Sequence, residues 1–154
     1  MRTAMGIVAL VTWITAAAAG LYLVSIWLIE YDKDFQRSAA TRLRPAVLVS
    51  HVTLASGGLF VWAGYLFFKS NNLAWISLLA LLLAATLGIT MAIRWIGVYR
   101  ETRELRLQAA VDPRLIGAGP PERNFPLPVV IGHGVLAVTT LTVVVLIAFG
   151  VGGS

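Results

Sequence analysis

Four long apolar runs dominate the chain and decide what it can fold into. Each run is long enough for a membrane-spanning helix, which needs about 20 apolar residues to cross the hydrocarbon core of a bilayer. The runs cover residues 3–29, 45–68, 73–99 and 126–150. They are rich in Leu, Val, Ile and Ala and lack the alternating pattern of an outer-membrane strand. The sequence therefore predicts an all-α integral membrane four-helix bundle that forms one transmembrane domain over residues 1–154.

The composition agrees with a lipid environment. Charged residues make up 12% of the chain and the mean hydropathy is +0.84, whereas soluble domains carry about 25% charged residues. The absence of cysteine excludes thiol–disulfide relays, thiolate-bound iron–sulfur clusters and cysteine zinc sites. In a membrane chain a basic excess such as the net charge of +5 reports orientation. We therefore expect the protein to be surrounded by the lipid bilayer and not to bind nucleic acid.

The first apolar run also has features of a signal peptide. Arg2 precedes it, and the small residues from Ala16 to Gly20 resemble a cleavage site. The apolar run nevertheless continues without a break to Ile29, which is too long for the core of a signal peptide. We therefore expect the first run to be a transmembrane helix.

The distribution of basic residues predicts the orientation in the membrane. Ten of the twelve Lys and Arg residues fall between residues 30 and 44 or between 94 and 125, and Arg2 and Lys69 are the other two. Cytoplasmic loops carry the excess of Lys and Arg. The first and third loops are thus predicted to be cytoplasmic and both termini external, in a multi-pass protein of the inner (plasma) membrane. The third helix is expected to continue to about residue 110, because residues 100–110 are polar helix formers without Gly or Pro.

The two halves of the sequence share a spaced set of residues. Ala16, Gly20, Trp27 and Tyr31 recur 68 positions later as Ala84, Gly88, Trp95 and Tyr99, and His51 recurs 82 positions later as His133. The pattern predicts two pseudo-repeated helical hairpins, related by a two-fold axis along the membrane normal. The alternative is a coincidence of biased composition, helped by aromatic residues that gather at membrane interfaces.

The repeat places the only two histidines at equivalent positions. His51 lies six residues after Pro45, about 9 Å into its helix, and His133 lies five after Pro128, about 7.5 Å in. An ionisable side chain inside a span is a functional candidate by default. The alternative is that each imidazole bonds a nearby carbonyl or water.

A four-helix membrane bundle with histidines at matched depth resembles the transmembrane b-type cytochromes, such as the cytochrome b561 family and the haem subunits of respiratory dehydrogenases. The resemblance implies that His51 and His133 are the axial metal ligands of haem b. It also implies glycines where the macrocycle approaches a helix backbone, and the candidates are Gly20, Gly88, Gly57, Gly58, Gly132 and Gly134. Small residues also serve ordinary helix packing in membranes. One departure is that many such cytochromes hold two haems with four histidines, and this chain has one pair.

Two further residues lie near the predicted depth of the histidines. Arg94 can hold a haem propionate through a charge-assisted hydrogen bond, or extend its side chain to a lipid phosphate. Met91 is a second candidate ligand, although methionine is also common in apolar helices.

These features predict a membrane-embedded electron-transfer subunit that exchanges electrons with a quinone or a redox partner protein near the cytoplasmic face. Whether it is an enzyme stays open. One alternative is a non-catalytic structural subunit of a larger membrane complex. Another is a small transporter. The apolar runs hold no deep carboxylate, and Glu30 lies at a helix end, so the histidines would have to handle the protons.

The orientation can be tested with a reporter fused after Ser154. Because the basic residues concentrate in the first and third loops, the fused reporter is expected to lie on the external side. Alkaline phosphatase reports an external position by its activity, and green fluorescent protein reports a cytoplasmic position by its fluorescence. Fluorescence without phosphatase activity would place the histidines near the external face instead.

Overall fold

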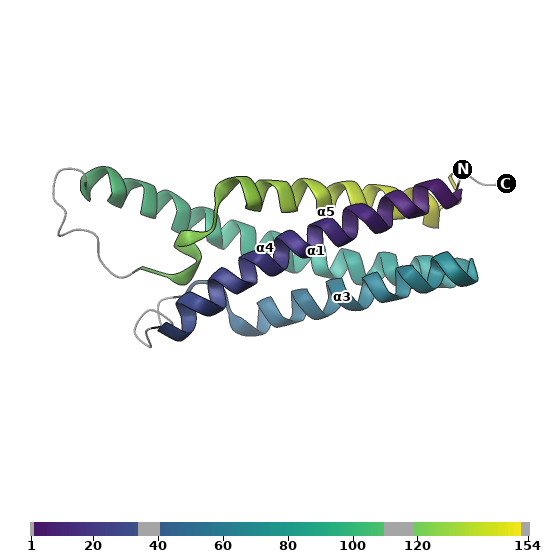
Figure 1. Ribbon diagram of the computed structural model, residues 1–154, viewed down its shortest axis with the longest axis horizontal. Coiled ribbons are helices and arrows are strands. Elements are labelled where there is room, and N and C mark those ends of the chain that lie inside the picture. The colour runs from purple at the N-terminus through teal and green to yellow at the C-terminus, as the bar shows by residue number, and fades with distance from the viewer. Residues whose placement is uncertain (1, 34–40, 110–118, 152–154) are drawn as a thin grey trace.

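The computed structural model describes residues 2–33, 41–109 and 119–151. They form the helices α1 (Arg2–Lys33), α3 (Pro45–Phe68), α4 (Asn71–Ala109) and α5 (Leu127–Ala148), with a short 3-10 helix, η2 (Pro121–Asn124), before α5 (Figure 1). All four long helices are apolar enough to cross a membrane. The predicted all-α four-helix membrane bundle is confirmed.

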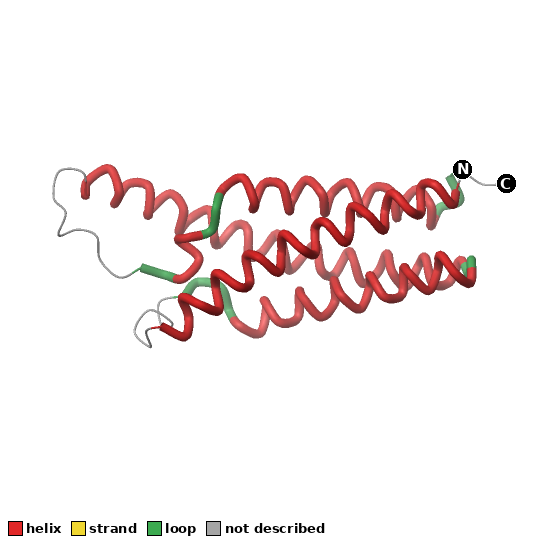
Figure 2. Tube along the Cα trace, viewed as in Figure 1, coloured by secondary structure: helices red, strands yellow, loops and turns green. Residues whose placement is uncertain are grey.

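The helices run antiparallel in chain order, so the bundle has two distinct ends (Figure 1). One end holds both termini and the two-residue connection between α3 and α4. The other end, called the loop end below, holds residues 41–44, which lead into α3, and residues 119–126, which lead into α5 (Figure 2). Among the basic residues of the orientation argument, Arg37 and Arg114 lie outside the described residues.

Each helix packs mainly against a helix of the other half of the sequence. The principal contacts are between α1 and α5 and between α3 and α4, and the pairs α4–α5 and α1–α3 contact less. The order around the bundle is therefore α1, α5, α4, α3, with α3 and α5 on one diagonal. Consecutive helices of the predicted hairpins α1–α3 and α4–α5 are thus the weaker neighbours.

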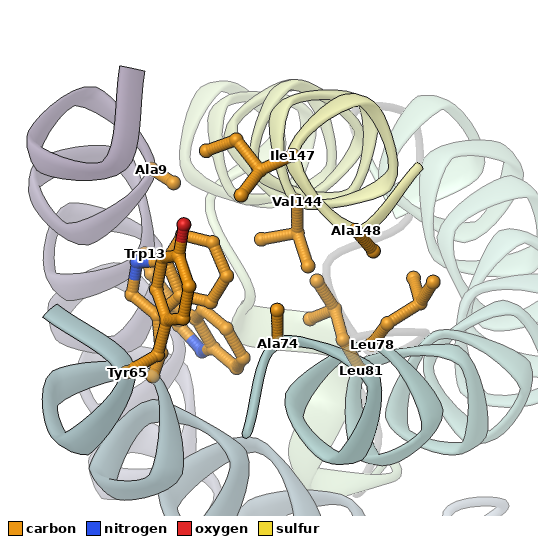
Figure 3. Close-up of a cluster of buried hydrophobic side chains, with 10 residues drawn as sticks. Ala9, Trp13, Tyr65, Ala74, Leu78, Leu81, Val144, Ile147 and Ala148 are labelled. Carbon is orange, nitrogen blue, oxygen red and sulfur yellow. The ribbon is translucent and has the colours of Figure 1, made fainter. Parts of the chain in front are cut away.

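A buried cluster fills the end of the bundle that holds the termini, where side chains of all four long helices converge (Figure 3). Trp62 of α3 is fully buried there and donates its indole N–H to the carbonyl oxygen of Gly6 on α1, at 3.2 Å. Trp13 of α1 lies against Gly58 of α3, where a Cβ atom would come within 3.0 Å of the indole ring. Small residues therefore let aromatic rings and backbones approach closely, as in other membrane bundles.

Burial follows the two offsets of the sequence repeat. With the 68-residue offset both members are buried in the pairs Ala9/Ser77, Trp13/Leu81, Ala16/Ala84 and Trp27/Trp95. With the 82-residue offset the same holds for Gly58/Thr140, Trp62/Val144 and Tyr65/Ile147. The two halves thus turn equivalent helix faces inward, with identical side chains in the pairs Ala16/Ala84 and Trp27/Trp95 and different ones in the other pairs.

Large apolar side chains cover the outside of the bundle. Phe60 and Phe67 of α3 are 78% and 83% exposed, and Leu, Ile and Val residues of the other helices also face outward. Apolar surface on this scale is incompatible with water and matches the hydrocarbon of a bilayer. The protein is therefore a multi-pass membrane protein.

The helix ends differ from the predicted ones by a few residues. The first helix, predicted for 3–29, continues through polar residues to Lys33, and the second, predicted for 45–68, has those bounds. The third runs to Ala109 as predicted and begins at Asn71. The fourth, predicted for 126–150, stops at Ala148 because Gly150 adopts a left-handed conformation with φ 83°.

Gly57 and Gly58 give a matched test of this packing. Gly58→Ala is expected to destabilise the bundle by about 1–3 kcal/mol, because the new methyl group overlaps the Trp13 ring and Ala80. Gly57→Ala is expected to be neutral or slightly stabilising, since nothing lies within 4 Å of its Cβ position and alanine favours the helix. Thermal unfolding in detergent measures both, and equal effects would contradict the packing described.

Candidate functional site

The two histidines project from diagonal helices at the same depth. His51 lies six residues after Pro45, where α3 begins, and His133 lies six after Leu127, where α5 begins. Both therefore lie about 9 Å along their helices from the loop end. Because α3 and α5 run in the same direction, the two side chains lie at one level of the bundle, and their rings are neighbours.

Each imidazole bonds the backbone of a neighbouring helix. Nδ1 of His51 lies 2.8 Å from the carbonyl oxygen of Ala84 on α4, and Nδ1 of His133 lies 2.8 Å from that of Ala16 on α1. A carbonyl oxygen can only accept, so Nδ1 must carry the hydrogen in both rings. In the neutral imidazole Nε2 then keeps its lone pair, which is the form that binds a metal.

A glycine stands beside each ring. A Cβ atom at Gly20 would lie 3.0 Å from Cε1 of His133, and one at Gly88 would lie 3.2 Å from Cε1 of His51. A helical side chain covers the turn that precedes it, so the missing side chain uncovers the carbonyl oxygen four residues earlier. The Ala16–Gly20 and Ala84–Gly88 pairs of the repeat thus form two equivalent receptors for imidazole.

The two rings are close neighbours in an edge-to-face arrangement. Their centroids are 6.2 Å apart, with an angle of 66° between the ring planes. Both histidines are half-buried. Within the part of the chain that the structure describes, no group of three or more His, Asp or Glu residues could enclose a metal ion. The site therefore offers two nitrogen donors and no further protein ligand from these residues.

The other predicted glycines are placed differently. Gly58 packs against Trp13 and Ala80, which gives it a role in helix packing. Beyond their chain neighbours and their own helix backbone, Gly57, Gly132 and Gly134 have nothing within 4 Å of their Cβ positions. The structure thus places Gly20 and Gly88 against the imidazoles of neighbouring helices, whereas Gly132 and Gly134 flank His133 on its own helix.

Arg94 and Met91 both lie toward the loop end. The Arg94 guanidinium group donates a hydrogen bond from Nη1 to the carbonyl oxygen of Arg42, at 3.1 Å. Met91 packs against a small buried cluster of Trp27, Leu43 and Leu48. Arg94 therefore supports the segment that leads into α3, and Met91 occupies an apolar contact.

Sequence reasoning did not identify Glu122. Its side chain is fully buried in η2, and its carboxylate accepts hydrogen bonds from Thr41 and from the backbone N–H of Arg42. Two tryptophans donate their indole N–H groups nearby: Trp27 to the Thr41 hydroxyl and Trp95 to the backbone carbonyl oxygen of Glu122. From the sequence, both could equally be aromatic residues at the membrane interface. The one feature of the sequence that could have pointed to Glu122 is its position, as an acidic residue directly after Pro120 and Pro121 in a basic loop.

Comparison of the chain with protein-family models, with curated proteins and with solved structures returns no match. The fold and the site define the class: an integral membrane four-helix bundle with a central histidine pair.

The hydrogen bonds predict which ring nitrogen carries a hydrogen. Nδ1 is expected to carry one in both histidines, because each Nδ1 faces a carbonyl oxygen. Solid-state ¹⁵N NMR of protein labelled only at histidine measures this directly, and His51→Phe assigns the two signals. An Nε2–H tautomer at either position would contradict the site geometry.

Proposed function

We propose that this protein is a membrane-embedded bis-histidine haem b protein, with His51 and His133 as the axial ligands and electron transfer as its activity. The observation that carries the proposal is the pair of inward-facing imidazoles, each fixed through Nδ1 to a backbone carbonyl oxygen. Histidine ligands of metals commonly donate their second nitrogen in this way, which fixes the ring and raises the basicity of the ligating nitrogen.

The spacing of the rings supports two axial ligands on one metal. Two metal–nitrogen bonds of about 2 Å, each extended by an imidazole radius of about 1.1 Å, separate opposite ring centroids by about 6.2 Å. The observed centroid separation is 6.2 Å. The chain thus holds the rings at a distance that suits a shared iron.

The number of donors favours haem over a bare metal ion. Protein sites for ions such as Zn²⁺ use three or four protein ligands, and the described residues offer two histidines without a third candidate. A porphyrin supplies four nitrogens of its own and asks the protein for one or two axial ligands. Haem when bound supplies reversible one-electron transfer.

The remaining residues would orient the cofactor and shield it from water. Gly20 and Gly88 let the imidazoles lie against α1 and α4, where Nδ1 of each ring bonds a backbone carbonyl oxygen. The mostly apolar residues of α3 and α5 beside the histidines would lower the local dielectric, which influences the reduction potential. Arg94 lies on the loop-end side of Gly88, where its guanidinium group can pair with a propionate.

The depth of the site indicates which side exchanges electrons. Both histidines lie about 9 Å from the loop-end start of their helices, so the cofactor lies near one face. The distribution of basic residues makes this the cytoplasmic face of the inner membrane. Exchange with a quinone or a redox partner protein at that face follows from this position.

Absorption spectra test the proposal. The protein purified with haem, or supplied with it, is expected to show a six-coordinate low-spin spectrum that responds to dithionite. His51→Ala and His133→Ala are each expected to abolish the low-spin form, and free imidazole is expected to restore part of it because it can enter the space left by the ring. A wild-type protein that stays colourless would overturn the proposal and favour the structural-subunit or transporter function.

The receptor glycines provide a second test. Gly20→Ala and Gly88→Ala are expected to reduce the low-spin fraction, because each new methyl group would lie 3.0–3.2 Å from an imidazole carbon. Gly64→Ala is the matched control, since its Cβ position is 3.8 Å from Leu73, an ordinary contact. Equal spectra for all three variants would contradict the proposed role of the receptors.

A further inference from the structure

One buried carboxylate joins the two halves of the protein at the loop end. Glu122 Oε1 accepts the backbone N–H of Arg42 at 2.6 Å, and Oε2 accepts the hydroxyl of Thr41 at 2.9 Å. The Glu122 side chain is 0% exposed. Since Thr41 and Arg42 precede α3 and Glu122 precedes α5, these bonds connect the two segments that lead into the histidine helices.

The matched tryptophans extend this network into the other two helices. Trp27 of α1 donates its indole N–H to the Thr41 hydroxyl oxygen at 3.2 Å. Trp95 of α4 donates to the backbone carbonyl oxygen of Glu122, also at 3.2 Å. The Thr41 hydroxyl also accepts the N–H of Leu43 at 3.2 Å, so its donor and both lone pairs are used. Each long helix is thereby linked to Glu122, directly or through its neighbouring segment.

We propose that Glu122 is a positioning residue that sets the axial alignment of α3 and α5, and through it the alignment of His51 with His133. The functional consequence rests on the haem function proposed above. Lipid-facing helices gain little from apolar contact with one another, because hydrocarbon is an equally good environment. Hydrogen bonds in the segments before the helices can therefore fix the position of one helix along the axis of another. Among these contacts, the Glu122 carboxylate is the one group that connects the segment before α3 with the segment before α5.

A neighbouring acidic residue offers a control. Glu101 of α4 forms an ion pair with Arg42 at 2.7 Å, but both side chains are about half exposed. Exposed pairs contribute little to stability. Glu101→Gln therefore removes a charge close to the network while the buried bonds of Glu122 remain.

Distances between spin labels measure the alignment without haem. The chain contains no cysteine, so paired cysteines can be introduced at chosen sites without background labelling. Val49 and Ile131 are exposed and lie two residues before the histidines on α3 and α5. Phe60 and Thr142, also exposed, occupy equivalent positions farther from the loop end of the same helices. The first pair reports the site and the second reports the rest of the bundle.

Glu122→Ala is expected to broaden or shift the Val49–Ile131 distance distribution and to leave the Phe60–Thr142 distribution unchanged. Thr41→Val, which keeps the side-chain shape and removes the hydroxyl, is expected to give a smaller change in the same direction. Glu122→Gln keeps one acceptor and is expected to recover much of the alignment. Glu101→Gln is expected to match the wild-type protein.

Two results would overturn the positioning role. One is a Val49–Ile131 distribution that Glu122→Ala and Thr41→Val both leave unchanged. The other is an equal change at both label pairs, which would indicate general loosening of the bundle. Haem binding separates this inference from the proposed function: a colourless wild-type protein in which Glu122→Ala still alters only the site pair would remove the haem function and leave the alignment role in place. In protein that binds haem, the same variant is expected to lose low-spin fraction in proportion to the broadening.

Discussion

The hydrogen bond from each histidine Nδ1 to a helix backbone carbonyl oxygen is the interaction on which the site depends. It is favoured by a glycine one turn beyond the acceptor, because a Cβ atom there would lie 3.0–3.2 Å from the imidazole. It fixes which nitrogen carries the hydrogen, and so which one stays free for a ligand. A half-buried imidazole in an apolar bundle is costly without such a partner. One bond therefore meets the cost of burial and aims the ring.

The two-fold arrangement explains why a short chain can build a centred site. Each half supplies one histidine and one receptor, but the histidine of each half bonds a helix of the other half: His51 bonds α4, and His133 bonds α1. The principal helix contacts follow the same exchange. The site therefore exists only when both halves are assembled. Among the described residues, Glu122 has no counterpart in the other half of this arrangement, and it connects the segments before α3 and α5 at the loop end.

Much of this arrangement could be predicted because membrane spans and local spacing follow simple rules. Helix length and the depth of His51 and His133 come from residue counts, and Gly20 and Gly88 were found because they recur with the repeat. Tertiary partners were harder: nothing local shows that Gly58 faces Trp13, or that a loop glutamate bonds a residue 80 positions away. The extent to which α1 prefers α5 over α3 also depends on packing between distant segments, which sequence spacing does not encode.

We propose that both imidazoles share one metal, and electron–nuclear double resonance of the ferric haem-loaded protein is the sharpest test of this shared ligation. Since the chain has only two histidines, labelling them with ¹⁵N marks the two proposed ligands and no other residue. The expected result is a low-spin signal with ¹⁵N couplings from two axial histidine nitrogens, reduced to one coupling in His51→Ala supplied with unlabelled imidazole. A high-spin signal, or a wild-type protein with one histidine coupling, would rule out shared ligation by His51 and His133.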